Sequence, residues 1–135
     1  MQLKNFKLEE FDSPDFKGSG KNMDADFMQL LDRARTEAGI PFKINSGYRT
    51  ESHNAKVGGK PKTNTSKGSS HMYGLAADIG CTDSVTRQKI LTALITVGFT
   101  RAGIGQSFVH VDLDKDKPNA IWLYSWNCFS RKHTW

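Results

Sequence analysis

Two helices stand out in the pattern of apolar and polar positions along the chain. From about Asp24 to Ala38, apolar side chains recur every three or four residues, and Gly39 supplies the stop. A second segment, from about Ser84 to Val97, has the same spacing and ends at Gly98. The apolar positions are Phe27, Leu30, Leu31, Ala34 and Ala38 in the first segment and Ile90, Leu91, Leu94 and Ile95 in the second. Each pattern predicts an amphipathic helix that buries one face.

Shorter segments alternate apolar and polar residues, as strands do when one face is buried. They cover residues 42–45, 75–79 and 108–113, and an apolar run at 120–124 is also typical of a strand. Residues 99–104 lead through a glycine turn into 108–113, which predicts a hairpin. A short helical turn is expected at 8–15, where a proline ends it. The pattern predicts an α+β fold, with helices packed on a small, mainly antiparallel sheet.

Length and hydropathy favour one small domain that spans residues 1–135. A chain of this size can bury a single hydrophobic core without staples. No apolar run approaches the roughly twenty residues that cross a membrane, and the first residues lack the apolar core of a signal peptide. We therefore expect a monomer that is made in the cytoplasm and does not insert into a membrane.

A formal net charge of +5 and a pI near 9.3 favour anionic partners. The densest group of lysines, Lys56, Lys60, Lys62 and Lys67, lies in a stretch rich in Gly, Ser and Thr that predicts a mobile loop. No recognition helix, zinc finger or aromatic and basic platform is evident, so we expect no nucleic-acid partner. Attraction to a phosphate-rich bacterial wall, or a simply solvated loop, is the better interpretation.

The cysteines and the late aromatic residues add little chemistry. Cys81 and Cys128 lack the spacing of a zinc finger and are expected to be free thiols, with a disulfide between them as the alternative. Trp122, Tyr124 and Trp126 could line a substrate groove. Aromatic residues near a terminus more often seal a core, and we expect that role for most of them.

Two imidazoles and a carboxylate, from His71, His110 and Asp78, carry the most specific chemical signal. Zinc in hydrolases commonly takes three such ligands and keeps a fourth position for water. Alternation along 108–113 places His110 and Asp112 on one strand face. If this strand pairs with 75–79, Asp78 and His110 meet across it, while His71 reaches in from the preceding turn. The pattern predicts a mononuclear zinc site, although each residue alone is more often an ordinary hydrogen-bonded side chain.

Four motifs in order strengthen this prediction. They are Ile44 to Thr50, His53 to Gly59, the Ser-x-His-x-x-Gly-x-Ala-x-Asp segment at 69–78, and Phe-Val-His-Val-Asp at 108–112. Together they resemble the M15 family of zinc D-alanyl-D-alanine carboxypeptidases and peptidoglycan endopeptidases over most of the chain. The resemblance implies Zn²⁺ as the cofactor and His71, Asp78 and His110 as its ligands. It also implies that Arg49 holds a carboxylate or carbonyl of the substrate.

The chemistry agrees with that role for Arg49, because a planar guanidinium can grip a carboxylate of a cell-wall stem peptide with two hydrogen bonds. Ser46 and Tyr48 flank the same turn, and Ser69 could orient a ligand or the substrate, so these three are further candidates for substrate binding. His53 is another candidate, but a surface helix is its expected place.

The sequence departs from the family at one position. Several members carry an acidic general base three residues before the last histidine ligand, and Ser107 stands there, beside Gln106. Asp112 is the nearest alternative, either as the catalytic base or as a partner that orients a ligand. Asp114 and Asp116 belong to a run of alternating charges that predicts a solvated turn.

The expected function is zinc-dependent hydrolysis of a peptide bond in the stem peptide of bacterial peptidoglycan, of the D-Ala-D-Ala carboxypeptidase or L-Ala-D-Glu endopeptidase type. Without a signal peptide, a phage endolysin released through a membrane lesion, or a component of a phage particle, is the natural setting. One alternative is a catalytically inactive zinc-bearing module that binds the cell wall, for which Ser107 is the main argument. Another is a metal-free structural protein of a phage particle.

Overall fold

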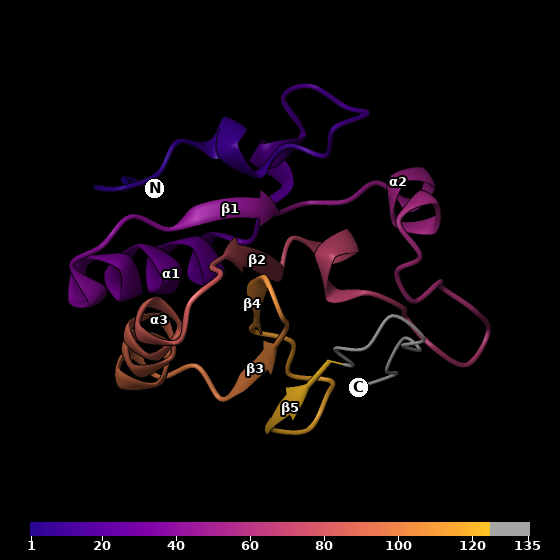
Figure 1. The fold of residues 1–135 in the computed structure, drawn as a ribbon. Helices are drawn as coiled ribbons and strands as arrows, with labels where there is room; N and C mark the ends of the chain where they lie inside the picture. The colour runs from indigo at the N-terminus through magenta and orange to yellow at the C-terminus, as the bar shows by residue number, and fades with distance from the viewer. Residues whose placement is uncertain (125–135) are drawn as a thin grey trace.

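A five-stranded sheet forms the centre of the fold (Figure 1). The structure is a computed structural model that describes residues 1–124. In the order in which they lie side by side, the strands are β1 (Lys43–Ser46), β2 (Ala76–Gly80), β4 (Phe108–Asp112), β3 (Arg101–Ile104) and β5 (Ala120–Leu123). Neighbouring strands are antiparallel except β3 and β5, which are parallel. The predicted α+β class and mainly antiparallel sheet are confirmed.

The two long helices lie side by side, as Figure 1 shows, and begin and end at recognisable caps. Helix α1 (Ala25–Ala38) starts after Asp24, whose carboxylate accepts a hydrogen bond from the Phe27 amide at 2.9 Å. Helix α3 (Ser84–Val97) starts after Asp83 in the same way. Each helix ends at a glycine with a left-handed backbone conformation. Both predicted helices are confirmed, with boundaries within one residue.

One predicted core position in α3 is wrong. Ile90 and Leu94 are buried, but Ile95 is 53% exposed. Five residues along a helix correspond to a rotation of about 140° beyond one full turn, so Ile95 lies far around the helix from Ile90. The apolar pattern of α3 is therefore wider than the face that the helix buries.

Alternation along β2 and β4 separates the core from a polar face. Ile79, Val109 and Val111 are fully buried in the hydrophobic cluster that includes α1 and α3. Because successive side chains of a strand point to opposite faces, Asp78 and His110 point away from that cluster. They are also directly paired in the antiparallel register, so their side chains are neighbours on the polar face. The prediction that they meet across neighbouring strands is confirmed.

The remaining elements are short. They are η1 (Leu8–Phe11), η2 (Ser19–Asn22), α2 (Glu51–Lys56) and η3 (Ser70–Tyr73). The first corresponds to the helical turn expected near the N-terminus, and α2 carries His53, as expected. Within residues 1–124, no helix is long and apolar enough to cross a membrane.

Gly74 makes the sharp passage from η3 into β2. Its backbone is left-handed, with a φ of +70°, and a Cβ there would lie 2.3 Å from the carbonyl oxygen of Asn22. A side chain is excluded on both grounds. This tight turn places His71 directly before the strand that carries Asp78.

The lysine-rich stretch after α2 is a loop. Residues 57–69 form an irregular connection, as expected for a loop. Lys67 is nevertheless held in place, because its ammonium lies 3.1 Å from Asp114 and 3.0 Å from Asp116.

Cys81 is a buried free thiol, whereas Cys128, like Trp126, lies outside the described residues.

Candidate metal centre

His71, Asp78 and His110 converge on the polar face of the sheet. One ligand atom from each residue can be chosen so that all three lie within 4.8 Å of one another. Oδ1 of Asp78 lies 2.9 Å from Nδ1 of His110 and 3.4 Å from Nε2 of His71. These three side chains, which we call the metal centre, could hold a metal ion.

The hydrogen bonds of His71 determine which of its nitrogens is available. Nδ1 lies 2.8 Å from the backbone oxygen of Gly47, and a carbonyl only accepts, so Nδ1 carries the proton. Nε2 is left with its lone pair directed toward Asp78. Burial lowers the pKa of His71 and outweighs the attraction of Asp78, which favours the neutral imidazole that metals require.

In His110 the roles of the two ring nitrogens are exchanged relative to His71. Its Nε2 lies 2.8 Å from Oδ2 of Asp112, so this nitrogen donates to a carboxylate and Nδ1 faces Asp78. Burial alone would lower the pKa of His110, but its hydrogen bonds to Asp112 and Asp78 outweigh burial and raise the pKa to about 9. A carboxylate behind a histidine ligand is the usual way in which proteins fix the orientation of the ring.

Asp78 is ionised and shared between two sets of partners. Burial alone would raise its pKa, but the interaction with His71 and the hydrogen bond from Nδ1 of His110 hold the pKa well below its usual range. Its second oxygen, Oδ2, lies 3.3 Å from Nη2 of Arg49. The carboxylate therefore connects the two imidazoles to the guanidinium.

The donor set fits a zinc ion. Zinc bound by nitrogen and oxygen at 2.0–2.1 Å in a tetrahedron has ligand atoms about 3.3 Å apart. The distances of 2.9 and 3.4 Å from Asp78 to the two imidazoles bracket that value. All three residues also line a pocket of about 480 Å³. The arrangement combines three metal donors with space for a substrate.

Arg49 lies beside the metal centre and is held by polar neighbours. Its Nε donates to Oγ of Ser46 at 3.0 Å, and its Nη1 donates to Oδ1 of Asn54 at 3.3 Å. Burial lowers the pKa of Arg49, and Asp78 opposes that change. The guanidinium lines the pocket, so a group of the substrate can reach it.

The other candidates for substrate binding have different surroundings. Ser46 contacts Arg49 and does not line the pocket, and Tyr48 packs against the hydrophobic core. Ser69 does line the pocket, and its hydroxyl oxygen accepts a hydrogen bond from the His71 amide at 3.2 Å. The structure thus brings Arg49 and Ser69 together with the metal centre and leaves Tyr48 outside the pocket.

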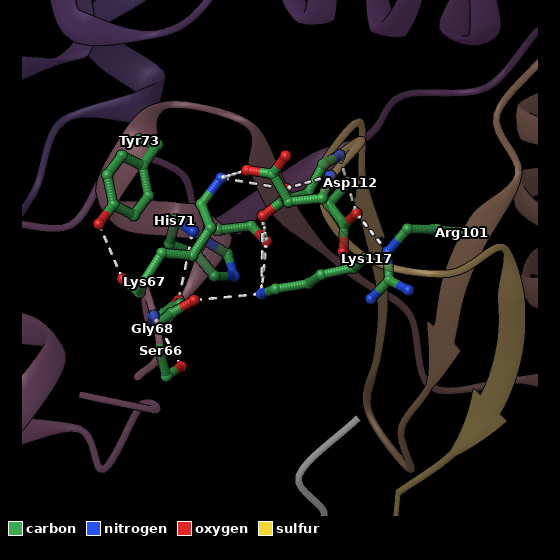
Figure 2. Close-up of polar contacts among 12 residues, drawn as sticks. Ser66, Lys67, Gly68, His71, Tyr73, Arg101, Asp112 and Lys117 are labelled. Atoms are coloured by element: carbon green, nitrogen blue, oxygen red, sulfur yellow. Dashed lines mark hydrogen bonds and ion pairs between the residues drawn. The ribbon is translucent and has the colours of Figure 1, made fainter. Parts of the chain in front are cut away.

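Asp112 is buried and has several partners, as Figure 2 shows in part. Besides His110, it accepts hydrogen bonds at Oδ1 from Nε of Arg101 at 2.7 Å and from the Asp114 amide at 3.1 Å. Both oxygens are therefore engaged. Ser107, at the position of the expected acid, is exposed in the turn before β4 and does not line the pocket.

The prediction of a solvated turn at Asp114 is wrong. Its carboxylate is buried and accepts hydrogen bonds from Oγ of Ser70 at 2.6 Å and from Nζ of Lys67 at 3.1 Å. Nζ of Lys117 lies 3.6 Å away. These partners replace the water that an exposed carboxylate would bind. The side chain of Asp116, in contrast, is 75% exposed, as expected.

Two aromatic residues form a wall of the pocket. Trp122 is buried, but its ring lies 5.6 Å from the ring of His110 and it lines the pocket together with Tyr124. Trp122 is thus buried as expected, but neither residue belongs to the main hydrophobic cluster, and both line the pocket as the alternative of a substrate groove predicted. The parallel pairing of β5 with β3 carries them to the polar face of the sheet.

Two imidazoles and a carboxylate on the wall of a pocket form a group that could hold a metal ion, as in metal-dependent hydrolases. The chain belongs to the Peptidase M15 family, because the sequence profile of that family matches residues 4–113. Membership implies a metallopeptidase, and the matched segment contains the whole metal centre. No protein among curated sequences matches the chain at a significant level.

Sequence reasoning missed three groups at the site: Arg101, Asn54 and the backbone oxygen of Gly47. Asn54 is buried and contacts Arg49. It lies in the segment His53 to Gly59, one of the four motifs that support the resemblance. Gly47 also stands inside a motif, but the role of its backbone oxygen leaves no mark in the sequence, and Arg101 carried no local signal. They reach the site only because the sheet and the loop after β1 bring them there.

Proposed function

We propose that this chain is a zinc-dependent peptidase that hydrolyses a peptide bond in the stem peptide of bacterial peptidoglycan. The observation that carries the proposal is the orientation of both histidines, each with one nitrogen tied to an acceptor and the other turned toward Asp78. Zinc held by His71, Asp78 and His110 would supply a Lewis acid that polarises a carbonyl and acidifies water.

The charge of the pocket supports an anionic peptide as the substrate. Arg49, Lys60 and Lys117 line it, and the stem peptide of peptidoglycan carries carboxylates. We propose that Arg49 binds such a carboxylate or a peptide carbonyl, because its guanidinium lies beside Asp78 and faces the pocket. Ser69, which lines the pocket, would bind or position the peptide, and Ser46 would act by holding Arg49 in place.

We propose that Asp112 orients His110 rather than accepting the proton of water. Both of its oxygens already accept hydrogen bonds. Three donors already occupy most of the acceptor sites of the carboxylate, and its side chain is only 1% exposed, so little room remains for a water molecule beside it. Its bond to Nε2 of His110 is the outer hydrogen bond that histidine ligands commonly make.

The bond that is cut and the biological setting belong to the same proposal. The resemblance of the four motifs to D-alanyl-D-alanine carboxypeptidases and peptidoglycan endopeptidases supports either a terminal D-Ala-D-Ala bond or the L-Ala-D-Glu bond. Lysis of a bacterial cell wall of the phage type is the setting that we propose.

A second candidate function is a zinc-bearing module that binds the cell wall without cleaving it. The observation in its favour concerns proton transfer. Among the described residues that line the pocket, the carboxylates are Asp78 and Asp112, and both are fully engaged in hydrogen bonds and ion pairs. This candidate predicts bound zinc and affinity for the wall with no hydrolysis.

Mass spectrometry of defined muropeptides and intact peptidoglycan separates the two functions. The protein is incubated with these substrates in the presence of zinc, with a chelator as the control. The proposed peptidase yields zinc-dependent products whose masses identify the cleaved bond. Zinc-loaded protein that binds the wall and yields no product would instead establish the binding module.

A further inference from the structure

Arg101 is a buried arginine on β3, the strand next to the one that carries His110. Its Nε donates to Asp112, its Nη1 donates to the backbone oxygen of Pro118, and its guanidinium lies 4.7 Å from the ring centre of Trp122. Contacts on three sides hold the guanidinium in one orientation. Figure 2 shows that Arg101 approaches Asp112 from the side of β3.

The contact with Arg101 decides which oxygen of Asp112 is left for His110. Oδ1 accepts from Arg101 at 2.7 Å and from the Asp114 amide, whereas Oδ2 accepts from Nε2 of His110. A hydrogen bond between two charged groups is among the strongest in proteins. Without the guanidinium, the carboxylate would lose the shorter of the two hydrogen bonds at Oδ1 and could rotate about its own bond.

We propose that Arg101 is a positioning residue of the metal centre. By fixing the carboxylate of Asp112, it keeps Nε2 of His110 as the donor to Asp112 and turns Nδ1 of His110 toward Asp78. The consequence for zinc rests on the proposed function, but the consequence for the orientation of His110 does not.

The packing around Trp122 supports the same role. The indole lies beneath the guanidinium and 5.6 Å from the imidazole of His110. It can do so because Gly103, which pairs with His110 on the adjacent strand, has no side chain: a Cβ there would lie 2.5 Å from Nε1 of Trp122. Arg101 therefore restrains His110 both through Asp112 and through this ring.

A purely structural role predicts a different result. Arg101 also joins β3 to the segment before β5 through Pro118, so its loss would destabilise the fold even if His110 did not depend on it. The two roles differ in whether the Nε2 proton of His110 and the affinity for zinc change in a protein that remains folded.

The test uses the full chain with Arg101→Ala and Arg101→Lys, and with Lys115→Ala as a control that removes an exposed positive charge nearby. Nitrogen-15 NMR of the metal-free proteins follows exchange of the Nε2 proton of His110, and competition with a chromophoric chelator measures zinc affinity. We expect the protected proton signal to be lost in Arg101→Ala, and zinc affinity to fall by no more than the roughly 10- to 100-fold that the loss of a direct partner of a histidine ligand costs. Lys115→Ala should change neither quantity.

Arg101→Lys keeps the test decisive if the alanine variant does not fold. One ammonium cannot reproduce the two directed bonds of the guanidinium, so we expect faster exchange of the proton and weaker zinc binding in a folded protein. A folded variant with an unchanged proton signal would overturn the proposal. Wild-type protein that binds no zinc would contradict the proposed function, and the proton signal would still test Arg101.

Discussion

Two buried carboxylates, Asp112 and Asp114, lie two residues apart in the chain but have different kinds of hydrogen-bond donors around them. Asp112 is contacted by an imidazole and a guanidinium, and Asp114 by a hydroxyl and the ammonium groups of two lysines. Figure 2 shows Asp112 close to Arg101, and Lys67 and Lys117 in the same region. We call the residues around Asp114, namely Ser70, Lys67 and Lys117, the lysine–aspartate cluster.

The lysine–aspartate cluster and the metal centre, which Asp112 supports, differ in the atoms that they could offer to a metal ion. In the lysine–aspartate cluster, Lys117 also donates to the oxygens of Gly68 and Ser70, and ammonium groups have no lone pair to offer a metal. In the metal centre, His71 and His110 each keep one nitrogen directed at Asp78. Buried charge alone therefore does not make a candidate metal site, whereas converging imidazole nitrogens and a carboxylate do.

The largest effect is expected from replacing a histidine of the metal centre. His110→Ala removes one of three donors, so zinc affinity should fall by more than the roughly 10- to 100-fold that the loss of an outer partner costs, and hydrolysis should fall to background. Isothermal titration with zinc and a muropeptide assay check both. His53→Ala on α2 is the matched control, and full activity of His110→Ala without bound metal would refute the mechanism.

A smaller effect, confined to the substrate, is expected at Arg49. Arg49→Lys keeps the positive charge but loses the paired donors of the guanidinium, so kcat/KM should fall roughly 10- to 100-fold, as expected for one or two charged hydrogen bonds. All three metal donors remain, so the variant should still take up zinc when zinc is in excess. Arg33→Lys, at an exposed position of α1, should behave like wild type, and an equal loss there would remove the special role of Arg49.

The lysine–aspartate cluster should affect stability more than metal binding. Asp114→Ala leaves Lys67 and Lys117 without their buried partner. Water reaches both side chains, which are 28% and 20% exposed, so the expected cost is about 1–3 kcal/mol in the free energy of unfolding. Urea denaturation measures this cost. Asp116→Ala should cost less than about 0.5 kcal/mol, and loss of zinc from Asp114→Ala as complete as that from His110→Ala would show that the regions are not separate.

The smallest effect concerns pH. Burial alone would raise the pKa of Asp114, but hydrogen bonds from Ser70 and Lys67 outweigh it and lower the pKa. A carboxyl whose pKa is lower in the folded than in the unfolded protein adds stability above the unfolded pKa of about 3.9, and this stability is lost as the pH falls through the folded pKa. Wild type should therefore lose stability below about pH 4 more steeply than Asp114→Asn. Equal slopes would contradict this assignment.

Local signals predicted much of the fold and of the metal centre. The apolar spacing from about Asp24 and the stop at Gly39 marked the ends of α1, and period-two alternation placed His110 and Asp112 on one face of β4. The three metal donors lie within motifs that the sequence displays in order. The helix ends and the alternation depend on residues that are close in the chain. The meeting of Asp78 with His110 depends on the pairing of β2 with β4, and it was predicted from strand alternation together with the order of the motifs.

The partners of Asp112 and Asp114 could not be predicted in the same way. Arg101 reaches Asp112 from a neighbouring strand, and Ser70 reaches Asp114 across 44 positions of the chain. A run of alternating Asp and Lys is common on solvated surfaces, and only the tertiary fold brings buried donors to it. Trp122 was misplaced for a related reason, since its face depends on the pairing of β5 with β3.

A crystal structure of the zinc-loaded protein, with anomalous scattering recorded at the zinc edge, tests the metal centre most directly. We expect one anomalous peak bound by Nε2 of His71, Nδ1 of His110 and the carboxylate of Asp78, with Nε2 of His110 still donating to Asp112. No peak at this position, or a peak bound through Nε2 of His110, would contradict the orientation on which the proposed function rests.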